Sequence, residues 1–161
     1  MIAKIERFEN RYLAYFERQL NHNVGAVWAM LTENAQLARW FEELQVGELR
    51  QGGFMKFNMP EVIEQNLEIF EFIPLSVLEF DWFGDVIRFE LHPNEDGCVL
   101  KLKEKLNSVT EQTKKDIAGW HVCLDVIQAL LDGNSIQRDE EWKKWYGKYA
   151  EKIDILTGLK E

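Results

Sequence analysis

From Leu44 to Leu106 the apolar residues tend to recur at every second position, in short runs separated by Gly, Pro or Asp. This alternation predicts strands with one buried face and one wet face, as in antiparallel sheets. Gly52-Gly53 and Gly84-Asp85 are suited to tight turns between such strands. We therefore predict six consecutive strands, over residues 44–50, 54–59, 62–73, 77–83, 86–92 and 98–106.

The segments on either side of this run predict one more strand and three helices. Residues 11–20 alternate loosely, which favours a strand. Asn23 and Asn34 are suited to cap two short helices. The segment Ser108–Glu111 matches a capping box, so a long helix should run to Asp132 and end at Gly133. The order is thus strand, two short helices, six strands and a long helix, which is an α+β arrangement.

A second long amphipathic helix is predicted near the C-terminus. Its apolar stripe has helical spacing and consists of Trp142, Trp145, Tyr146, Tyr149, Ile153 and Leu156. We predict a main domain over residues 1–136 and this helix, over residues 137–161, docked on the same domain. A dimer interface and a mobile lid are the alternatives for the stripe.

Charge and cysteine usage limit the classes of partner. The 161 residues include 28 Asp and Glu against 19 Lys and Arg, a net charge of −9. This acidity argues against nucleic acid and anionic lipid as partners. No apolar run approaches the length of about 18 residues that a membrane span needs, and the N-terminus lacks the apolar core of a signal peptide. Cys98 and Cys123 lie far apart, as expected for reduced thiols in a cytoplasmic protein.

Residues with catalytic or metal-binding chemistry are few. No nucleotide-binding or hydrolase motif occurs, and His22, His92 and His121 lack metal-ligand spacing, so we expect no cofactor and no metal. Glu104 shares parity with Leu102, which predicts an inward carboxyl that orients a ligand or acts as an acid, unless the strand end is irregular and leaves it in solvent. His121 is either a packed or surface helix residue, or an acid or base in a pocket. Gly119 indicates close approach of a strand, or space for a ligand or a bend.

An ordered set of motifs resembles the START-like superfamily, also called SRPBCC or Bet v-type, and within it bacterial proteins similar to the activator of the ninety-kilodalton heat-shock chaperone ATPase. The set covers about residues 11–133. Its members are Val27-Trp28-x-x-Leu31-Thr32, Leu37-x-x-Trp40-Phe41, Gly52-Gly53, Pro74-x-x-x-Leu78-x-x-x-Trp82 and Gly119-Trp120-His121-x-Cys123-Leu124-Asp125.

The resemblance implies a helix-grip fold, in which a curved antiparallel sheet of about seven strands wraps around the long helix and leaves a hydrophobic cavity. We therefore predict non-enzymatic binding of a small hydrophobic molecule. One alternative is a stress-related, co-chaperone-like adaptor that binds another protein through the Trp142–Leu156 helix, and a further one is a cyclase or hydrolase that uses Glu104 or His121. The predicted ligand-binding residues are Phe57, Phe80, Trp82, Phe89, Leu102, Glu104, Trp120, His121, Leu124 and Ile127.

Overall fold

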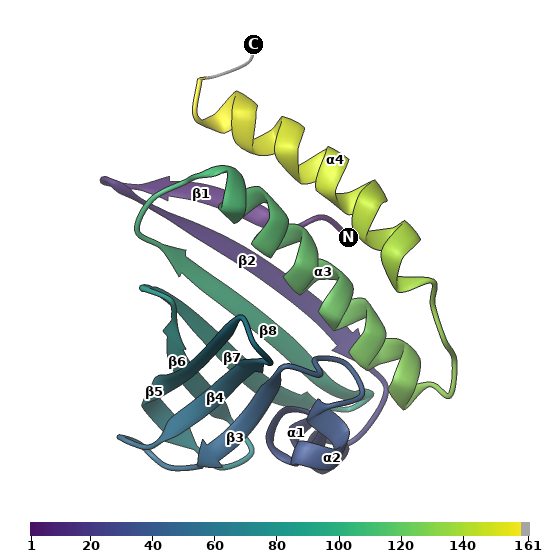
Figure 1. Ribbon diagram of the computed structural model, residues 1–161. Helices are drawn as coiled ribbons and strands as arrows, with labels where there is room; N and C mark the ends of the chain where they lie inside the picture. Colours follow the sequence, from purple (N-terminus) through teal and green to yellow (C-terminus); the bar gives the residue numbers. More distant parts are fainter. Residues whose placement is uncertain (159–161) are drawn as a thin grey trace. The chain divides into compact units, whose positions relative to one another are not determined.

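The computed structural model describes residues 1–158, which form eight strands and four helices (Figure 1). The strands are β1 (Lys4–Phe8), β2 (Arg11–Leu20), β3 (Leu44–Glu48), β4 (Phe54–Met59), β5 (Ile63–Ile73), β6 (Val77–Trp82), β7 (Asp85–Asn94) and β8 (Gly97–Leu106). The helices are α1 (Val24–Thr32), α2 (Asn34–Leu37), α3 (Glu111–Leu131) and α4 (Arg138–Leu156).

The strands form one sheet in the order β1-β2-β8-β7-β6-β5-β4-β3. Neighbouring strands from β3 to β7 pair antiparallel, as do β1 and β2. The predicted α+β class is confirmed: a curved antiparallel sheet, a long helix and a further C-terminal helix, consistent with a helix-grip fold.

The sheet has eight strands where the sequence predicted about seven, and the additional one is β1. It pairs with β2 from Lys4↔Tyr15 to Phe8↔Arg11. Of its five residues, Ile5 alone is buried, so β1 lacks the alternation on which the prediction depended. Its backbone hydrogen bonds to β2, rather than a buried face, define it as a strand.

The chain divides into two compact units. The terminal unit comprises Met1–Phe16 and the residues from Lys105 onward, and contains β1, α3 and α4. The central unit comprises Glu17–Glu104 and contains α1, α2 and the strands from β3 to β7. The predicted division after residue 136 stays a prediction, and the last three residues of the predicted 137–161 segment lie outside the described residues.

Capping side chains fix where the helices begin. The side chain of Asn23 accepts a hydrogen bond from Ala26 N at 2.8 Å, which confirms it as the cap of α1. The prediction for Asn34 was wrong, because Asn34 lies inside α2 and its side chain binds both backbone groups of Val46. Asn34 therefore ties α2 to β3.

The cap of α3 also differs from the prediction. Thr110, not Ser108, is the N-cap residue, and its backbone N–H donates to Thr113 Oγ1 at 2.9 Å. The helix ends at Leu131, and Gly133 has a φ of +77°, in agreement with the predicted glycine stop.

Candidate functional site

Aromatic side chains gather on the sheet and the short helices of the central unit. Period two along β6 and β7 places Phe80 and Phe89 on the buried face, as predicted. We use the name "aromatic cluster" for seven residues whose rings contact one another: Trp40, Phe41, Phe57, Phe80, Trp82, Phe83 and Phe89.

Most contacts in the aromatic cluster are edge-to-face. The ring centroids of Phe57 and Trp82 lie 5.7 Å apart at an interplanar angle of 85°, and Phe41 lies 6.2 Å from Phe57. This geometry directs the positive edge of one ring at the negative face of the next, which is worth about 0.5–1.5 kcal/mol per pair beyond area burial. The indole N–H of Trp40 donates to the carbonyl of Met30 at 2.7 Å. The cluster is thus an apolar surface with this polar group satisfied.

Exposure rises from one end of the aromatic cluster to the other. Phe80 and Phe89 are buried, Phe57 and Trp82 keep 8% and 7% of their surface accessible, and Phe83 is 46% exposed. The cluster therefore runs from the core to the solvent, and it reaches the solvent at the turn between β6 and β7.

That turn was predicted one residue too late in the sequence. Trp82 pairs with Asp85, so the two loop residues are Phe83 and Gly84, not Gly84 and Asp85. Both have positive φ, +53° and +97°, as in a type I′ turn. Glycine is therefore the second loop residue, and the first is an aromatic residue.

The other residues that the sequence predicted for the site are divided between the two units. Leu102 and Glu104 of β8 belong to the central unit, and both are fully buried. The inward direction predicted for Glu104 is consistent with that burial. Trp120, Leu124 and Ile127 are buried residues of α3 in the terminal unit. Their assignment to a ligand site stays a prediction.

His121, also on α3, is fully buried and lies within a polar network in the terminal unit. Its Nδ1 lies 2.7 Å from the hydroxyl of Tyr149 on α4, and its Nε2 lies 3.3 Å from an Asp125 carboxylate oxygen. The ring stacks on Trp145 at 3.7 Å between centroids. His121 is therefore a packed helix residue, which was one of the two predicted readings.

The network extends to the N-terminal segment. Ala3 N–H donates to the Tyr149 hydroxyl at 2.8 Å, and Lys152 Nζ donates to Ala3 O at 2.7 Å. The Asp125 carboxylate can only accept, so we assign a proton to His121 Nε2. In the neutral ring, Nδ1 then accepts from the Tyr149 hydroxyl.

Further contacts hold α3 and α4 side by side (Figure 1). Lys114 of α3 contacts Asp154 of α4 at 2.6 Å and Glu111 at 2.9 Å. Hydrogen bonds raise the pKa of Lys114, and the bond to Asp154 contributes more than the bond to Glu111. The indole N–H of Trp142 donates to Lys115 O at 3.4 Å. The aromatic stripe of α4 thus contacts α3 of its own unit.

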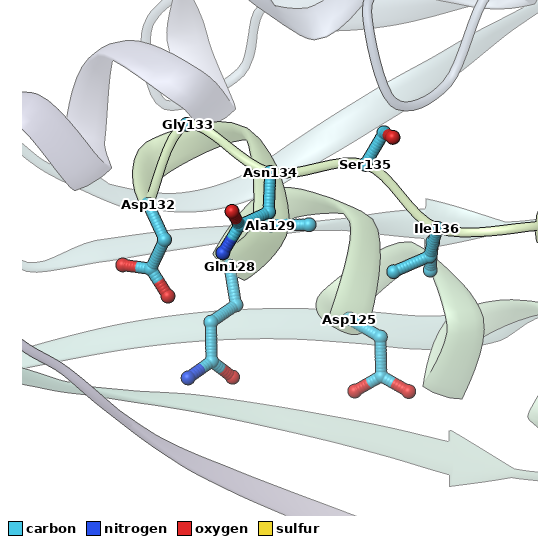
Figure 2. Close-up of a pocket in the computed structure, with 8 residues that line it drawn as sticks. All are labelled: Asp125, Gln128, Ala129, Asp132, Gly133, Asn134, Ser135 and Ile136. Atoms are coloured by element: carbon cyan, nitrogen blue, oxygen red, sulfur yellow. The ribbon is translucent and has the colours of Figure 1, made fainter.

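A groove of about 810 Å³ lies at the C-terminal end of α3 and in the loop that follows (Figure 2). Its lining residues are Asp125, Gln128, Ala129, Asp132, Gly133, Asn134, Ser135 and Ile136, none of which was predicted as a site residue. Figure 2 shows the side chains of Asp125, Gln128 and Asp132 on the same side of the helix. Carboxylates beside a helix C-terminus favour polar or cationic groups over a hydrophobic ligand.

The outer face of the central sheet carries a charge cluster around Arg88. Its guanidinium contacts Glu79 at 3.0 Å and Glu71 at 3.2 Å, and it hydrogen-bonds Glu90, which Lys103 also contacts at 3.2 Å. Burial raises the pKa of Glu90, but hydrogen bonds from Arg88, His92 and Lys103 outweigh it and lower the pKa to about 2. The charged side chains on this face thus form a set of cross-strand pairs.

Residues 1–158, which the structure describes, contain no group of three or more His, Cys, Asp or Glu side chains arranged to hold a metal ion. No helix among them is long and apolar enough to cross a membrane.

Sequence reasoning missed three residues of the aromatic cluster, namely Trp40, Phe41 and Phe83. Trp40 and Phe41 belong to the motif Leu37-x-x-Trp40-Phe41, which indicated the family resemblance but no role in the site. Phe83 stands beside Gly84 in a turn, where an aromatic residue is unusual, and that position was the available signal.

Solved structures with a similar fold include proteins from several bacteria. A conserved protein of unknown function from Enterococcus faecalis is 25% identical, with a TM-score of 0.86, over 99% of this chain and 92% of that chain. CalU16 from Micromonospora echinospora is 17% identical, with a TM-score of 0.71, over 94% and 93%. The protein SSP2350 from Staphylococcus saprophyticus is 19% identical, with a TM-score of 0.66, over 78% and 96%. The last two show the fold alone.

A comparison with curated proteins gave no match. The family model described as activator of Hsp90 ATPase homolog 1-like protein matches residues 21–132, which is more than half of the chain. The chain therefore belongs to the family of activator of Hsp90 ATPase homolog 1-like proteins, within the START-like superfamily.

Proposed function

We propose that this protein binds a small hydrophobic molecule without converting it chemically, and that the aromatic cluster of the central unit is the surface against which the apolar part of the ligand lies. The observation that carries the proposal is the continuity of the cluster. Its rings contact one another from the fully buried Phe80 to the exposed Phe83.

The chemistry of the aromatic cluster supports an apolar ligand. Sites for small molecules are mostly apolar and carry few polar anchors. Phe57 and Trp82 lie near the exposed end, where a ligand ring gains edge-to-face contacts with them and an alkyl chain gains van der Waals contacts. Leu102 and Glu104 of the same unit are the proposed apolar and polar additions to this surface. A ligand cavity against α3, formed with Trp120, His121, Leu124 and Ile127, stays a prediction.

The contacts of α4 favour ligand binding over protein interaction through the Trp142–Leu156 stripe. Tyr149 is buried, Trp145 stacks on His121, and the Trp142 indole donates to the α3 backbone. An adaptor that used this stripe would first have to break these contacts.

Native mass spectrometry of the purified protein, before and after extraction with organic solvent, tests the proposal. We expect a mass above that of the polypeptide before extraction and the polypeptide mass afterwards. In the second arm, the extracted protein is titrated with the fluorescent probe 1-anilinonaphthalene-8-sulfonate, and oleate is added as the competitor. A polypeptide mass in both samples, together with unchanged probe emission, would overturn the proposal.

A pair of matched variants locates the binding surface. Phe57→Leu removes a ring from the aromatic cluster but keeps an apolar side chain, and we expect it to weaken probe binding about fivefold. Phe72→Leu is the control, because Phe72 belongs to the same sheet but packs on Trp28, outside the cluster. Equal affinities of the two variants would contradict the assignment of the site to the cluster.

A further inference from the structure

Phe83 stands at a backbone position that does not suit it. It is the first of two loop residues between β6 and β7, with φ +53°. Type I′ turns of this kind favour Asn, Asp or Gly, since a bulky residue at positive φ is sterically disfavoured. Strained positions of this type gather at functional sites, because folding alone does not select them.

The backbone of the turn is held in place independently of the ring. Asp81 Oδ1 accepts a hydrogen bond from Gly84 N–H at 3.1 Å. An added Cβ at Gly84 would meet nothing within 4 Å, so the space beside the turn is open. Phe83 is itself 46% exposed, so its ring can change rotamer toward the solvent while the backbone keeps its conformation.

The ring of Phe83 lies over the two cluster residues that approach the surface. Its centroid is 5.3 Å from that of Phe57 and 5.1 Å from that of Trp82, in edge-to-face geometry, while nearly half of its own surface is exposed. An aromatic side chain thus covers the exposed end of the aromatic cluster, at a position where Asn would fit the backbone better.

We propose that Phe83 is the entry residue of the hydrophobic ligand site: its ring swings aside to admit the ligand and returns to retain it. This inference rests on the proposed function and adds a retention role to it. The strained turn is then explained by function, since a retaining ring has to stand at the surface end of the cluster.

The variant Phe83→Asn separates retention from stability. Asn suits the turn, and this backbone gain offsets part of the loss of two ring contacts, so the midpoint of thermal unfolding should fall by only a few degrees. Release of 1-anilinonaphthalene-8-sulfonate, followed by stopped-flow fluorescence after dilution, should become about tenfold faster, because two ring contacts that close the site are lost. Phe83→Tyr keeps the ring and should release the probe at the wild-type rate.

Leu75→Asn is the matched control. Leu75 lies in the β5–β6 turn at the other end of β6, is 47% exposed and has a φ of +62°. The substitution relieves the same kind of backbone position and should leave probe release unchanged. If Phe83→Asn fails to fold, Phe83→Gly makes the same test, because glycine also accepts positive φ.

The outcomes distinguish this inference from the proposed function. If the wild type binds the probe, but Phe83→Asn and Leu75→Asn both release it at the wild-type rate, Phe83 is not the entry residue and the proposed function stands. Equal acceleration in both variants would also overturn the inference, because it would indicate general loosening of the sheet. A wild type that binds no probe overturns both.

Discussion

The two units use aromatic side chains in contrasting ways. In the aromatic cluster of the central unit, rings meet rings in mostly edge-to-face contacts, and exposure rises steadily toward Phe83. In the terminal unit, the rings of α4 are tied to polar groups: Tyr149 bonds His121 and Ala3, and Trp145 contacts the His121 ring and the ammonium groups of two lysines.

The two kinds of contact differ in how readily a ligand can replace them. Edge-to-face ring contacts leave no polar group unsatisfied when they break, so a hydrophobic ligand can replace some of them at small cost. A buried hydrogen bond lacks this tolerance, because a polar group left without its partner in the interior costs about 1–3 kcal/mol. We infer that the central unit provides the adaptable surface and that the network around Tyr149 fixes α4 and the N-terminal segment in place.

Removal of the Tyr149 hydroxyl tests this contrast with the largest expected effect. Tyr149→Phe leaves Ala3 N–H and His121 Nδ1 without the hydroxyl that bonds both, and we expect a loss of about 2 kcal/mol in the free energy of unfolding, measured by urea denaturation. Probe release should stay at the wild-type rate.

Tyr146→Phe is the matched control for this change. The ring of Tyr146 stacks on Trp142, and loss of its hydroxyl should alter stability by no more than about 0.5 kcal/mol. Equal stability of the two variants would refute the fixed network. Faster probe release by Tyr149→Phe would instead show that the two aromatic regions do not act separately.

The pH dependence of stability tests the charged face of the sheet that carries the aromatic cluster. The pKa of Glu90 is about 2 in the folded protein and near its ordinary value, about 4.3, in the unfolded chain. Between these values the unfolded state binds more protons, so stability falls as the pH falls from about 4.3 to 2. After allowance for partial solvent screening, we expect Glu90 to contribute about 1–2 kcal/mol of this loss.

Urea denaturation of the wild type and of Glu90→Gln, at several pH values between 2 and 7, isolates this contribution. The two proteins should differ most at neutral pH and converge toward pH 2. Glu95→Gln, at the exposed tip between β7 and β8, should follow the wild type throughout. A constant difference between Glu90→Gln and the wild type at all pH values would contradict the lowered pKa.

The parts of the fold that could be predicted are those in which buried and exposed side chains follow the period of the secondary structure. The period-two pattern located the central strands, and the parity of Phe80 and Phe89 gave their buried side correctly. The burial of Glu104 agrees with one of its two predicted readings. Strand β1 was not predicted, because backbone pairing defines it and most of its side chains are exposed.

The contacts between side chains were less predictable than the buried or exposed side of each strand and helix. His121 and Tyr149 are 28 positions apart, and their hydrogen bond depends on how α3 and α4 pack, which periodicity along one helix does not contain. The aromatic ring in the β6–β7 turn was overlooked because Gly84 was placed first in the loop, where the strand register places Phe83.

Gly119 provides the smallest and most discriminating test of the contrast between the units. An added Cβ there would lie 4.0 Å from the Trp142 indole nitrogen, which is ordinary contact distance, so α3 accepts alanine without displacement of α4. Gly119→Ala should therefore raise the free energy of unfolding by about 0.5–1 kcal/mol through helix propensity. If the space at Gly119 served a ligand, as one reading of the sequence suggested, probe affinity would fall in this variant although stability rose. We expect unchanged affinity, because the proposed ligand surface lies on the central unit and the space at Gly119 faces α4.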